Sequence, residues 1–278
     1  MARAALPGRL TWQLVSVVEL VEETTRAKSL VLTQPDWPGG YRAGQHVDVR
    51  LTAEDGYQAE RSYSIASAPE DDHLVLTVER LEDGEVSPYL VDELRPGDEL
   101  ELRGPIGGYF VWEEALGGPL VLIGGGSGVV PLRSMLRHWS MTGRGAPARL
   151  VYSSRRLSEL IYREELTGYA DRDGVDVRFV LTREWPEDWQ GHRGRIDPAL
   201  VNEVAGPVEE QARVYICGPN AFVEAAAGWL ADGGRDPSRI RTERSVPDQW
   251  RSIERSGTTP DPPAISTSGP PSDSSQTK

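Results

Sequence analysis

The stretch "LVLIGGGSGVVPL" at residues 120–132 decides the second half of the fold. Its first half is an apolar run typical of a buried strand, and the residues after the glycines have helical periodicity, with Pro131 in the first turn. Glycines let a backbone approach a pyrophosphate closely, and a helix N-terminus offers unpaired N–H groups. Because a strand precedes the glycines and a helix comes after them, Gly126, Ser127 and Gly128 are predicted to bind a nucleotide rather than to form a plain turn.

An alternation of strands and helices continues after this loop. The segments typical of strands are "ARLVYSS", "VDVRFVLT" and "RVYICG", and those with helical periodicity are "SELIYREELTGYA" (158–170) and "NAFVEAAAGWLADGG". Such an alternation indicates a parallel sheet covered on both faces. We therefore predict an α/β domain over residues 118–246. A disordered tail is expected over 247–278, which is rich in Pro, Ser and Thr.

The N-terminal part of the chain has a different pattern. Six short alternating segments, "LTWQLVSVVELV", "AKSLVLTQP", "QHVDVRL", "RSYSIAS", "HLVLTVERL" and "DELELRGP", are separated by turn signals such as "WPGG" and "RPGD". One helical segment, "VSPYLVDEL" (86–94), interrupts them. Strands at this spacing predict an antiparallel β-barrel domain over residues 8–113, with the domain boundary near 112–118.

The composition limits the kinds of partner. A formal net charge of −13 argues against nucleic acid and against an anionic membrane surface. No segment approaches the ~18 apolar residues of a membrane span. The single cysteine, Cys217, and four scattered histidines argue against a disulfide and against a metal site. We expect a cytoplasmic, monomeric protein that binds no metal.

The strand after the glycine loop ends in a basic corner. The segment "VYSSRRLSEL" places Ser153, Ser154, Arg155 and Arg156 where dinucleotide-binding folds meet the adenosine ribose. Arginine there favours the 2′-phosphate of NADP, and no carboxylate follows until Glu159. The alternative is a solvated corner in an arginine-rich protein.

A later strand runs into the turn "CGP". In "VYICGPNAF" (214–222), Cys217 stands at the carboxyl end of a parallel strand, where open α/β sheets bind their ligands. The alternative is that this cysteine is only a small buried apolar residue.

One strand of the predicted barrel combines arginine, tyrosine and serine. In "ERSYSIAS" (60–67), alternation places Arg61 and Tyr63 on one face and Ser62 and Ser64 on the other. By itself this pattern is also compatible with an ordinary edge strand that has a solvated arginine.

Five motifs in this order, on a barrel followed by a parallel sheet, resemble the ferredoxin–NADP reductase family of flavoprotein reductases. The resemblance covers about residues 10–245. The motifs are Arg61-Ser62-Tyr63-Ser64, Gly84-Glu85-Val86-Ser87, Gly104-Pro105 with Gly107 and Gly108, Gly126-Ser127-Gly128-Val129-Val130-Pro131, and Cys217-Gly218-Pro219. The resemblance implies an FAD-dependent oxidoreductase that transfers a hydride from NAD(P)H to FAD.

The resemblance also implies roles for single residues. Arg61 would pair with the flavin pyrophosphate, and Tyr63 would stack on the flavin ring. The implied catalytic residues, where nicotinamide meets flavin, are Ser64, Cys217 and Glu243. The implied FAD-binding residues are Arg61, Ser62, Tyr63, Ser64, Val78, Gly84, Val86 and Ser87. The implied NAD(P)-binding residues are Gly126, Ser127, Gly128, Ser153, Ser154, Arg155, Arg156, Cys217, Gly218 and Pro219.

The sequence departs from the family in two ways. Ser245 stands where relatives often have an aromatic residue that covers the flavin. We therefore expect an open flavin face, with Trp250 in the tail as an alternative cover. Many relatives also contain a domain with a [2Fe–2S] cluster. Because the single cysteine of this sequence cannot ligate such a cluster, we expect any iron–sulfur relay to belong to a separate protein.

The resemblance leaves the electron acceptor open. We expect a separate redox protein, either a ferredoxin or a component of an oxygenase or molybdenum enzyme. One alternative is a flavin reductase or diaphorase that acts on a small acceptor. Others are an electron-transfer subunit that is inactive alone and a nucleotide-sensing module without catalysis. The choice between NADPH and NADH stays open.

Overall fold

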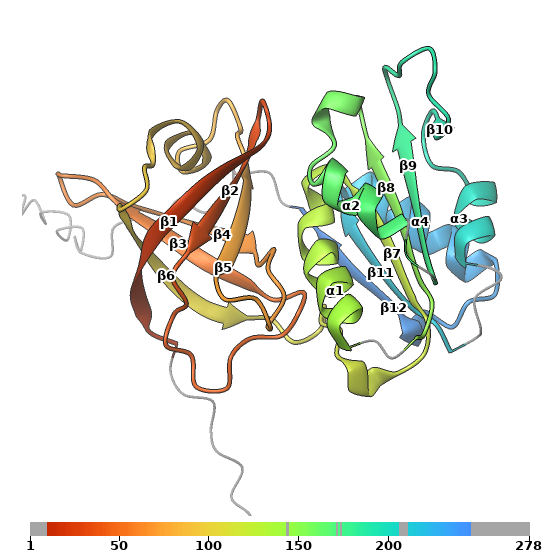
Figure 1. The fold of residues 1–278 in the computed structure, drawn as a ribbon, viewed down its shortest axis with the longest axis horizontal. Coiled ribbons are helices and arrows are strands. Elements are labelled where there is room, and N and C mark those ends of the chain that lie inside the picture. The colour runs from red at the N-terminus through yellow and green to blue at the C-terminus, as the bar shows by residue number, and fades with distance from the viewer. Residues whose placement is uncertain (1–9, 143–144, 171, 173, 206–210, 246–278) are drawn as a thin grey trace, which may run out of the picture.

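The computed structural model describes residues 10–142, 145–170, 172, 174–205 and 211–245. Two bodies lie side by side, an antiparallel body of strands and a parallel sheet with helices on both faces (Figure 1). This confirms the predicted fold class. The predicted domain limits, 8–113 and 118–246, stay a prediction, and the tail with Trp250 lies outside the described residues.

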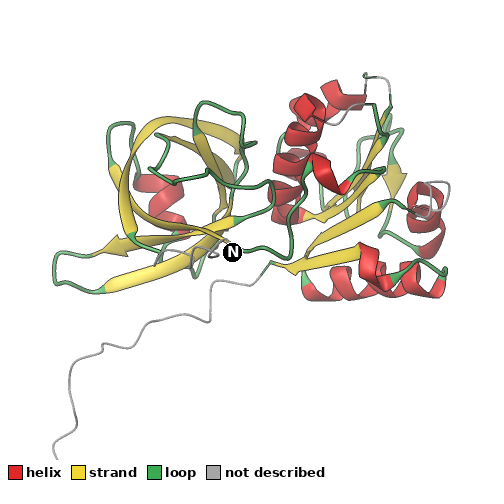
Figure 2. Cartoon of the chain, turned by 90° about the horizontal axis from the view of Figure 1, so that it is seen from below, coloured by secondary structure: helices red, strands yellow, loops and turns green. Residues whose placement is uncertain are grey.

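The first body is built from six strands that pair in antiparallel fashion. They are β1 (Trp12–Thr24), β2 (Ala27–Leu32), β3 (His46–Thr52), β4 (Gln58–Ser64), β5 (Leu74–Glu79) and β6 (Glu99–Ile106), in the order β4-β3-β6-β1-β2-β5. A bridge between Ile65 and Leu76 brings the two edge strands together. The sheet therefore curls into a barrel, which Figure 2 shows from below.

The barrel's helical segment agrees with the prediction to within one residue at each end. Residues 87–93 are helical, with a π-helical turn over Tyr89–Glu93 (η1), and the helix ends there because Leu94 adopts an extended backbone with ψ 141°. Gly84 lies in the loop before this helix and Ser87 is its first residue, so the helix fixes where the loop ends.

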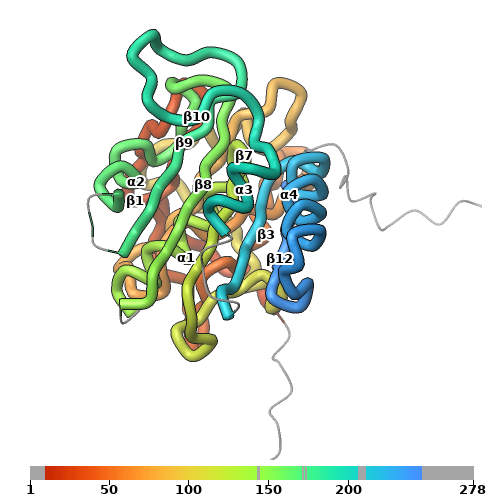
Figure 3. Tube along the Cα trace, turned by 90° about the vertical axis from the view of Figure 1, so that its right-hand side faces the viewer, coloured from red at the N-terminus to blue at the C-terminus, as the bar shows by residue number. Residues whose placement is uncertain are grey.

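The second body has six strands that pair in parallel fashion. They are β7 (Leu120–Gly125), β8 (Ala148–Ser154), β9 (Val175–Leu181), β10 (His192–Arg193), β11 (Arg213–Gly218) and β12 (Ile240–Arg244), in the order β10-β9-β8-β7-β11-β12. Helices α1 (Val129–Thr142) and α2 (Arg163–Ala170) cover the face toward the barrel. Helices α3 (Pro198–Ala205) and α4 (Asn220–Asp232) cover the other face (Figures 1 and 3).

The order of the parallel strands determines where a ligand can bind. The chain enters at the central strand β7, adds β8, β9 and β10 on one side, and then crosses to β11 on the other. A crevice forms at such a switch point, outside the carboxyl ends of the strands. Here those ends are Gly125 and Gly218. Every residue of β7 is buried, as expected for a strand covered on both faces.

One helix begins later than the sequence pattern predicts. The expected helix over 158–170 is a 3₁₀ turn, Leu157–Glu159 (η4), followed by α2 from Arg163. Tyr162 interrupts the helix because its backbone is left-handed, with φ 58°. Its main-chain amide donates to Glu23 of the barrel at 3.3 Å, so a contact with the other body outweighs the local helical preference.

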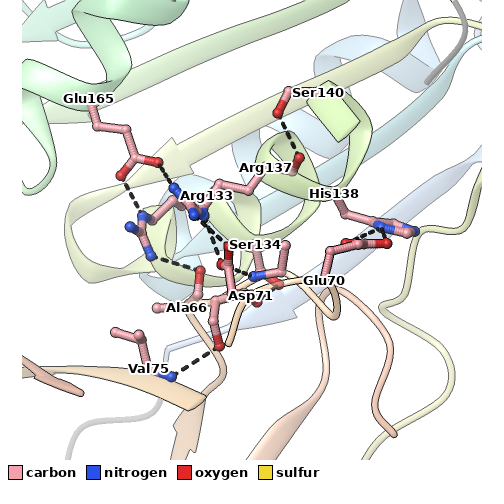
Figure 4. A network of polar contacts seen from close by, with 12 residues as sticks. Ala66, Glu70, Asp71, Val75, Arg133, Ser134, Arg137, His138, Ser140 and Glu165 are labelled. Atoms are coloured by element: carbon pink, nitrogen blue, oxygen red, sulfur yellow. Dashed lines mark hydrogen bonds and ion pairs between the residues drawn. The ribbon is translucent and has the colours of Figure 1, made fainter. Parts of the chain in front are cut away.

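Helix α1 also contacts the barrel directly. Its side chains reach the segment 66–71, which follows β4 (Figure 4). One hydrophobic core cluster includes Ala27, Ala43 and Ala66 of the barrel together with residues of α1 and the parallel sheet. The two bodies therefore share buried surface.

Candidate active site

A cavity of about 1040 Å³ lies between the barrel and the parallel sheet. Its lining comes from both bodies and brings together most of the predicted site residues. These are Arg61, Ser62, Tyr63, Ser64, Ser87, Gly126, Ser127, Gly128, Ser153, Ser154, Arg155, Cys217, Pro219 and Glu243. Residues from the two ends of the described chain therefore face one space.

Five of the predicted residues do not line this cavity. Val78 and Val86 are fully buried in the barrel core. Arg156 forms ion pairs beside the cavity, and Gly84 lies in the loop before Ser87. Gly218 lies directly behind the lining at the end of β11, and its carbonyl accepts a hydrogen bond from the amide of Ser245 at 3.0 Å.

Strand β4 presents a buried cation to the cavity. The Arg61 side chain is only 10% exposed, and its Nη2 donates to Glu85 at 3.0 Å. Tyr57 also donates to Glu85, at 3.1 Å. The guanidinium is thus held in place at the cavity wall, where it can bind a phosphate by a charge-assisted hydrogen bond.

The serine that follows Arg61 has a different partner. Ser62 Oγ donates to Asp48 Oδ1 on β3 at 2.6 Å, and Arg103 donates to the same carboxyl group at 2.7 Å. Burial alone would raise the pKa of Asp48, but these hydrogen bonds and the Arg103 charge hold the pKa below its usual value. Asp48 therefore stays ionised and fixes β4 against β3.

The glycine loop lies directly against the end of β11. A Cβ atom on Gly128 would lie 2.3 Å from the carbonyl oxygen of Cys217, so only glycine permits this approach. Gly126 has a left-handed backbone, with φ 57°, and faces open space. Helix α1 begins immediately afterwards at Val129, whose amide already donates to the carbonyls of Gly126 and Ser127, so at this helix N-terminus it is the glycine loop that lines the cavity.

The three predicted catalytic residues lie together in the cavity wall. Cys217 and Glu243 are partners across the parallel β11–β12 pair. Burial raises the pKa of the Cys217 thiol far above its usual value, and the Glu243 charge adds to the shift, so the thiol stays neutral. Burial also raises the pKa of Glu243 to about 7, although a hydrogen bond with Ser64 partly offsets this.

The basic corner after β8 is present but already paired. Glu159 accepts from Arg155 Nε at 2.8 Å and from Arg156 Nη1 at 3.3 Å, and Glu184 pairs with Arg156 Nε at 2.9 Å. Ser153 and Ser154 are each 7% exposed and line the cavity beside these pairs. A 2′-phosphate would have to compete with two carboxylates for the arginines.

Several lining residues were not predicted from the sequence. They are His46, Thr77, Glu159 and Phe222, together with others from the β1–β2 turn and β5. Phe222 is signalled by its place after the "CGP" turn, and Glu159 by its position near the basic corner. His46 and Thr77 have no local signal, because they reach the cavity only through the barrel's closure.

The residues present fit a flavin dinucleotide and a nicotinamide dinucleotide. A buried cation, an aromatic ring and a serine lie on β4, and opposite them a side-chain-poor loop opens at a helix N-terminus. Among the described residues, no group of three His, Cys, Asp or Glu side chains could hold a metal ion. No helix in those ranges is long and apolar enough to span a membrane.

Comparison with known proteins agrees with this geometry. An oxidoreductase FAD-binding domain matches residues 13–111, and an oxidoreductase NAD-binding domain matches residues 122–228. These matches confirm FAD and NAD(P) as the cofactors. The chain is also similar to a solved cytochrome P450 reductase from Amycolatopsis, with a TM-score of 0.74 and 28% identity, over 86% of this chain and 71% of that one.

Two curated relatives identify the family of the chain. It is 32% identical over 218 residues to the reductase component of propane 2-monooxygenase from Mycolicibacterium goodii, covering 76% of this chain but only 61% of that protein's length. It is 36% identical over 189 residues to ferredoxin–NADP reductase B from Sorangium cellulosum, covering 66% of this chain and 76% of the relative. The chain therefore belongs to the ferredoxin–NADP reductase-like family of FAD- and NAD(P)-binding oxidoreductases.

Proposed function

We propose that the protein transfers a hydride from NAD(P)H to FAD and then passes the electrons to a separate redox protein. The observation that supports this most strongly is the shared cavity, in which the β4 motif of the barrel faces the glycine loop of the parallel sheet. When bound, FAD supplies the hydride-accepting chemistry, and the protein supplies binding and orientation. Because residues of one chain line the cavity, we also propose that a monomer is sufficient for hydride transfer. We further propose that the protein is cytoplasmic.

The barrel residues would hold the flavin. Arg61 would bind its pyrophosphate, with Glu85 as the carboxylate that orients the guanidinium. Tyr63 would pack on the flavin ring, and Ser87 would close the phosphate side of the site. The buried Ser87 hydroxyl already accepts the amide of Leu81 at 3.1 Å, so the loop is ordered by the chain itself.

The residues of the parallel sheet would hold the nicotinamide nucleotide. The amides of Gly126, Ser127 and Gly128 would bind its pyrophosphate at the N-terminus of α1. The neutral, buried Cys217 would pack beside the nicotinamide without offering a charge. Ser64 and Glu243 form a hydrogen-bonded pair that can hold or move a proton where the two cofactors meet.

The proposed acceptor is a separate protein. Named relatives include reductase components of propane 2-monooxygenase, glycine betaine monooxygenase and 3-ketosteroid-9-alpha-monooxygenase. The sequence contains one cysteine, which cannot ligate an iron–sulfur cluster. By analogy with these reductase components, we place the next electron carrier on another chain, namely a ferredoxin or a component of an oxygenase or molybdenum enzyme.

A reconstitution experiment tests this function. The purified protein should be yellow, and heat should release FAD that chromatography separates from FMN. Under anaerobic conditions NADH or NADPH should bleach the flavin, and an added ferredoxin should then restore its colour. Recovery of FMN, or a bleached flavin that only small dyes reoxidise, would contradict the proposal.

A further inference from the structure

Helix α1 connects the two halves of the proposed active site. Its N-terminus continues from the glycine loop, and its second and third turns contact the barrel segment 66–71 (Figure 4). That segment begins two residues after Ser64. A shift of the helix against the segment would therefore change the distance between the glycine loop and strand β4.

Two contacts hold the helix to the main chain of the segment. Arg133 Nη1 donates to the carbonyl of Ala66 at 3.0 Å, and Ser134 Oγ donates to the carbonyl of Ser67 at 2.6 Å. Ser134 and Ser67 are both fully buried. Tyr41 of the barrel also contacts Ser67, with 2.7 Å between the two hydroxyl oxygens. These bonds fix the backbone that leads out of β4.

Four charged side chains form ion pairs in this contact, next to which His138 Nδ1 of α1 lies 2.9 Å from Glu70 of the barrel (Figure 4). Arg137 donates to both oxygens of Asp71, from Nη2 at 2.6 Å and from Nε at 2.9 Å, and its Nη1 donates to Glu165 at 2.8 Å. Arg133 Nε donates to the other oxygen of Glu165 at 2.7 Å. Two guanidinium groups thus face two carboxylates, and of these four side chains only Asp71 belongs to the barrel.

Asp71 is the barrel carboxylate that accepts the paired hydrogen bonds from Arg137. Burial would raise its pKa, but hydrogen bonds from Arg137 and from the amide of Ala68, with the arginine charges, hold the pKa below its usual value. Asp71 therefore stays ionised and orders the turn in which it lies. A two-point arginine–carboxylate pair fixes orientation as well as distance.

A second contact leads from the same helix to the cavity. The Arg133 guanidinium lies over the ring of Tyr162, with 4.5 Å from Cζ to the ring centroid. The Tyr162 hydroxyl donates to Thr77 Oγ1, and Thr77 lines the cavity. The left-handed backbone of Tyr162 is a costly conformation for a buried aromatic residue, and such outliers cluster at functional sites.

From these contacts we propose that Arg137 is a positioning residue for hydride transfer. Its paired hydrogen bonds with Asp71 hold helix α1, and with it the glycine loop, at a fixed distance from Ser64. The role rests on the proposed function, because it concerns how nicotinamide meets flavin. Loss of the pair should slow hydride transfer while both cofactors still bind, since neither binding site includes Arg137.

The test compares two arginines that each pair with two carboxylates. Arg137→Met removes the pair between the bodies. Arg178→Met is the matched control, because Arg178 pairs with Asp176 at 3.0 Å and Glu203 at 2.6 Å within the parallel-sheet body. Arg137→Lys keeps the charge but loses the two-point contact. Stopped-flow flavin reduction at several NADH and NADPH concentrations separates the limiting rate from nucleotide affinity.

We expect Arg137→Met to lower the limiting rate by about tenfold to a hundredfold, the cost of a displacement near 1 Å. Nucleotide affinity and FAD content should stay close to wild type, and Arg137→Lys should recover part of the rate. The Arg178→Met rate should be unchanged. An Arg137→Met rate like that of wild type, or an equal loss in Arg178→Met, would overturn the proposal.

Hydrogen exchange supplies a readout that does not depend on turnover. In Arg137→Met the amide of Ala68, which donates to Asp71 at 2.8 Å, should exchange faster, and in Arg178→Met it should not. If Arg137→Met fails to fold, Arg137→Lys decides by the same two measurements. A wild-type protein that NAD(P)H cannot reduce would contradict the proposed function, whereas unchanged exchange at Ala68 would contradict the positioning role itself.

Discussion

Cys217 and Glu243 are direct partners across the β11–β12 pair, which places a carboxyl group beside a buried thiol in the cavity wall. The hydrogen bond between Glu243 and Ser64 connects this pair to strand β4 of the barrel. A carboxyl group in this setting titrates near neutral pH, whereas the thiol stays neutral. Of these two side chains, Glu243 is therefore the one whose charge changes near neutral pH.

The raised pKa of Glu243 predicts a pH-dependent stability difference. The carboxyl group has a pKa of about 7 in the folded state and its ordinary value of 4.5 in the unfolded state. Between these values the folded state binds more protons, so stability falls as pH rises through this window. Compared with Glu243→Gln, wild type should lose on the order of 1–3 kcal/mol between pH 4.5 and 7. Denaturant unfolding across this range measures the difference, and a constant difference would contradict the assignment.

Arg61 should matter for FAD far more than Arg155 does. A charge-assisted pair with phosphate contributes about 1.5–3 kcal/mol, so Arg61→Ala should weaken FAD binding by about tenfold or more. Arg155→Ala is the matched control, because Arg155 is also paired with a carboxylate beside the cavity. Fluorescence titration of the apoprotein with FAD gives both affinities. Equal weakening in the two variants would remove Arg61 from the flavin site.

Glu159 should decide how well NADPH is used. It neutralises Arg155 and contacts Arg156, so Glu159→Gln should free the guanidinium groups for a 2′-phosphate. We expect kcat/KM for NADPH relative to NADH to rise by about threefold to tenfold. Glu203→Gln serves as the control, because the Glu203 side chain is 63% exposed and pairs with Arg178, and neither residue lines the cavity. A ratio that is unchanged in Glu159→Gln, or that moves toward NADH, would refute this role.

Gly128 should tolerate no side chain. A Cβ there would lie 2.3 Å from the Cys217 oxygen and 2.6 Å from the Gly218 nitrogen, both main-chain atoms that no rotamer change can move. Gly128→Ala should destabilise the fold by about 1–3 kcal/mol and weaken NAD(P)H binding while FAD is retained. In α2, Gly168→Ala meets no atom within 4 Å and should stabilise by about 0.5–1 kcal/mol. Thermal unfolding with nucleotide titration distinguishes the two variants, and similar behaviour would contradict the close approach at β11.

The sequence predicts much of the fold because the informative signals are local. Period-two alternation and turn residues locate the six barrel strands, and the apolar run at β7 predicts a buried strand. The order of the barrel strands is not predictable in this way, since β1 pairs with β6 far along the chain. The sequence pattern also predicts the start of α2 wrongly, because the amide of Tyr162 is bound to Glu23, which lies far away in the sequence.

The candidate site shows the same division. Motifs identify Arg61, the glycine loop and Cys217, and the cavity brings them together. Of the carboxylates that pair with the arginines, Glu184 is not evident from these motifs, because it reaches Arg156 from the loop after β9. Ser245, which departs from the family pattern, does line the cavity, and its amide is bound to Gly218. Such pairings arise only when distant segments fold against each other.

Hydride transfer between the two cofactors can be followed directly by the loss of flavin absorbance. FAD-loaded protein is mixed anaerobically with NADH or NADPH, each either unlabelled or deuterated at the transferred position, and flavin absorbance is followed by stopped flow. If hydride passes between the two cofactors in the shared cavity, at least one nucleotide should bleach the flavin, and deuterium should slow the bleaching. A flavin that stays oxidised while both nucleotides bind would contradict the account.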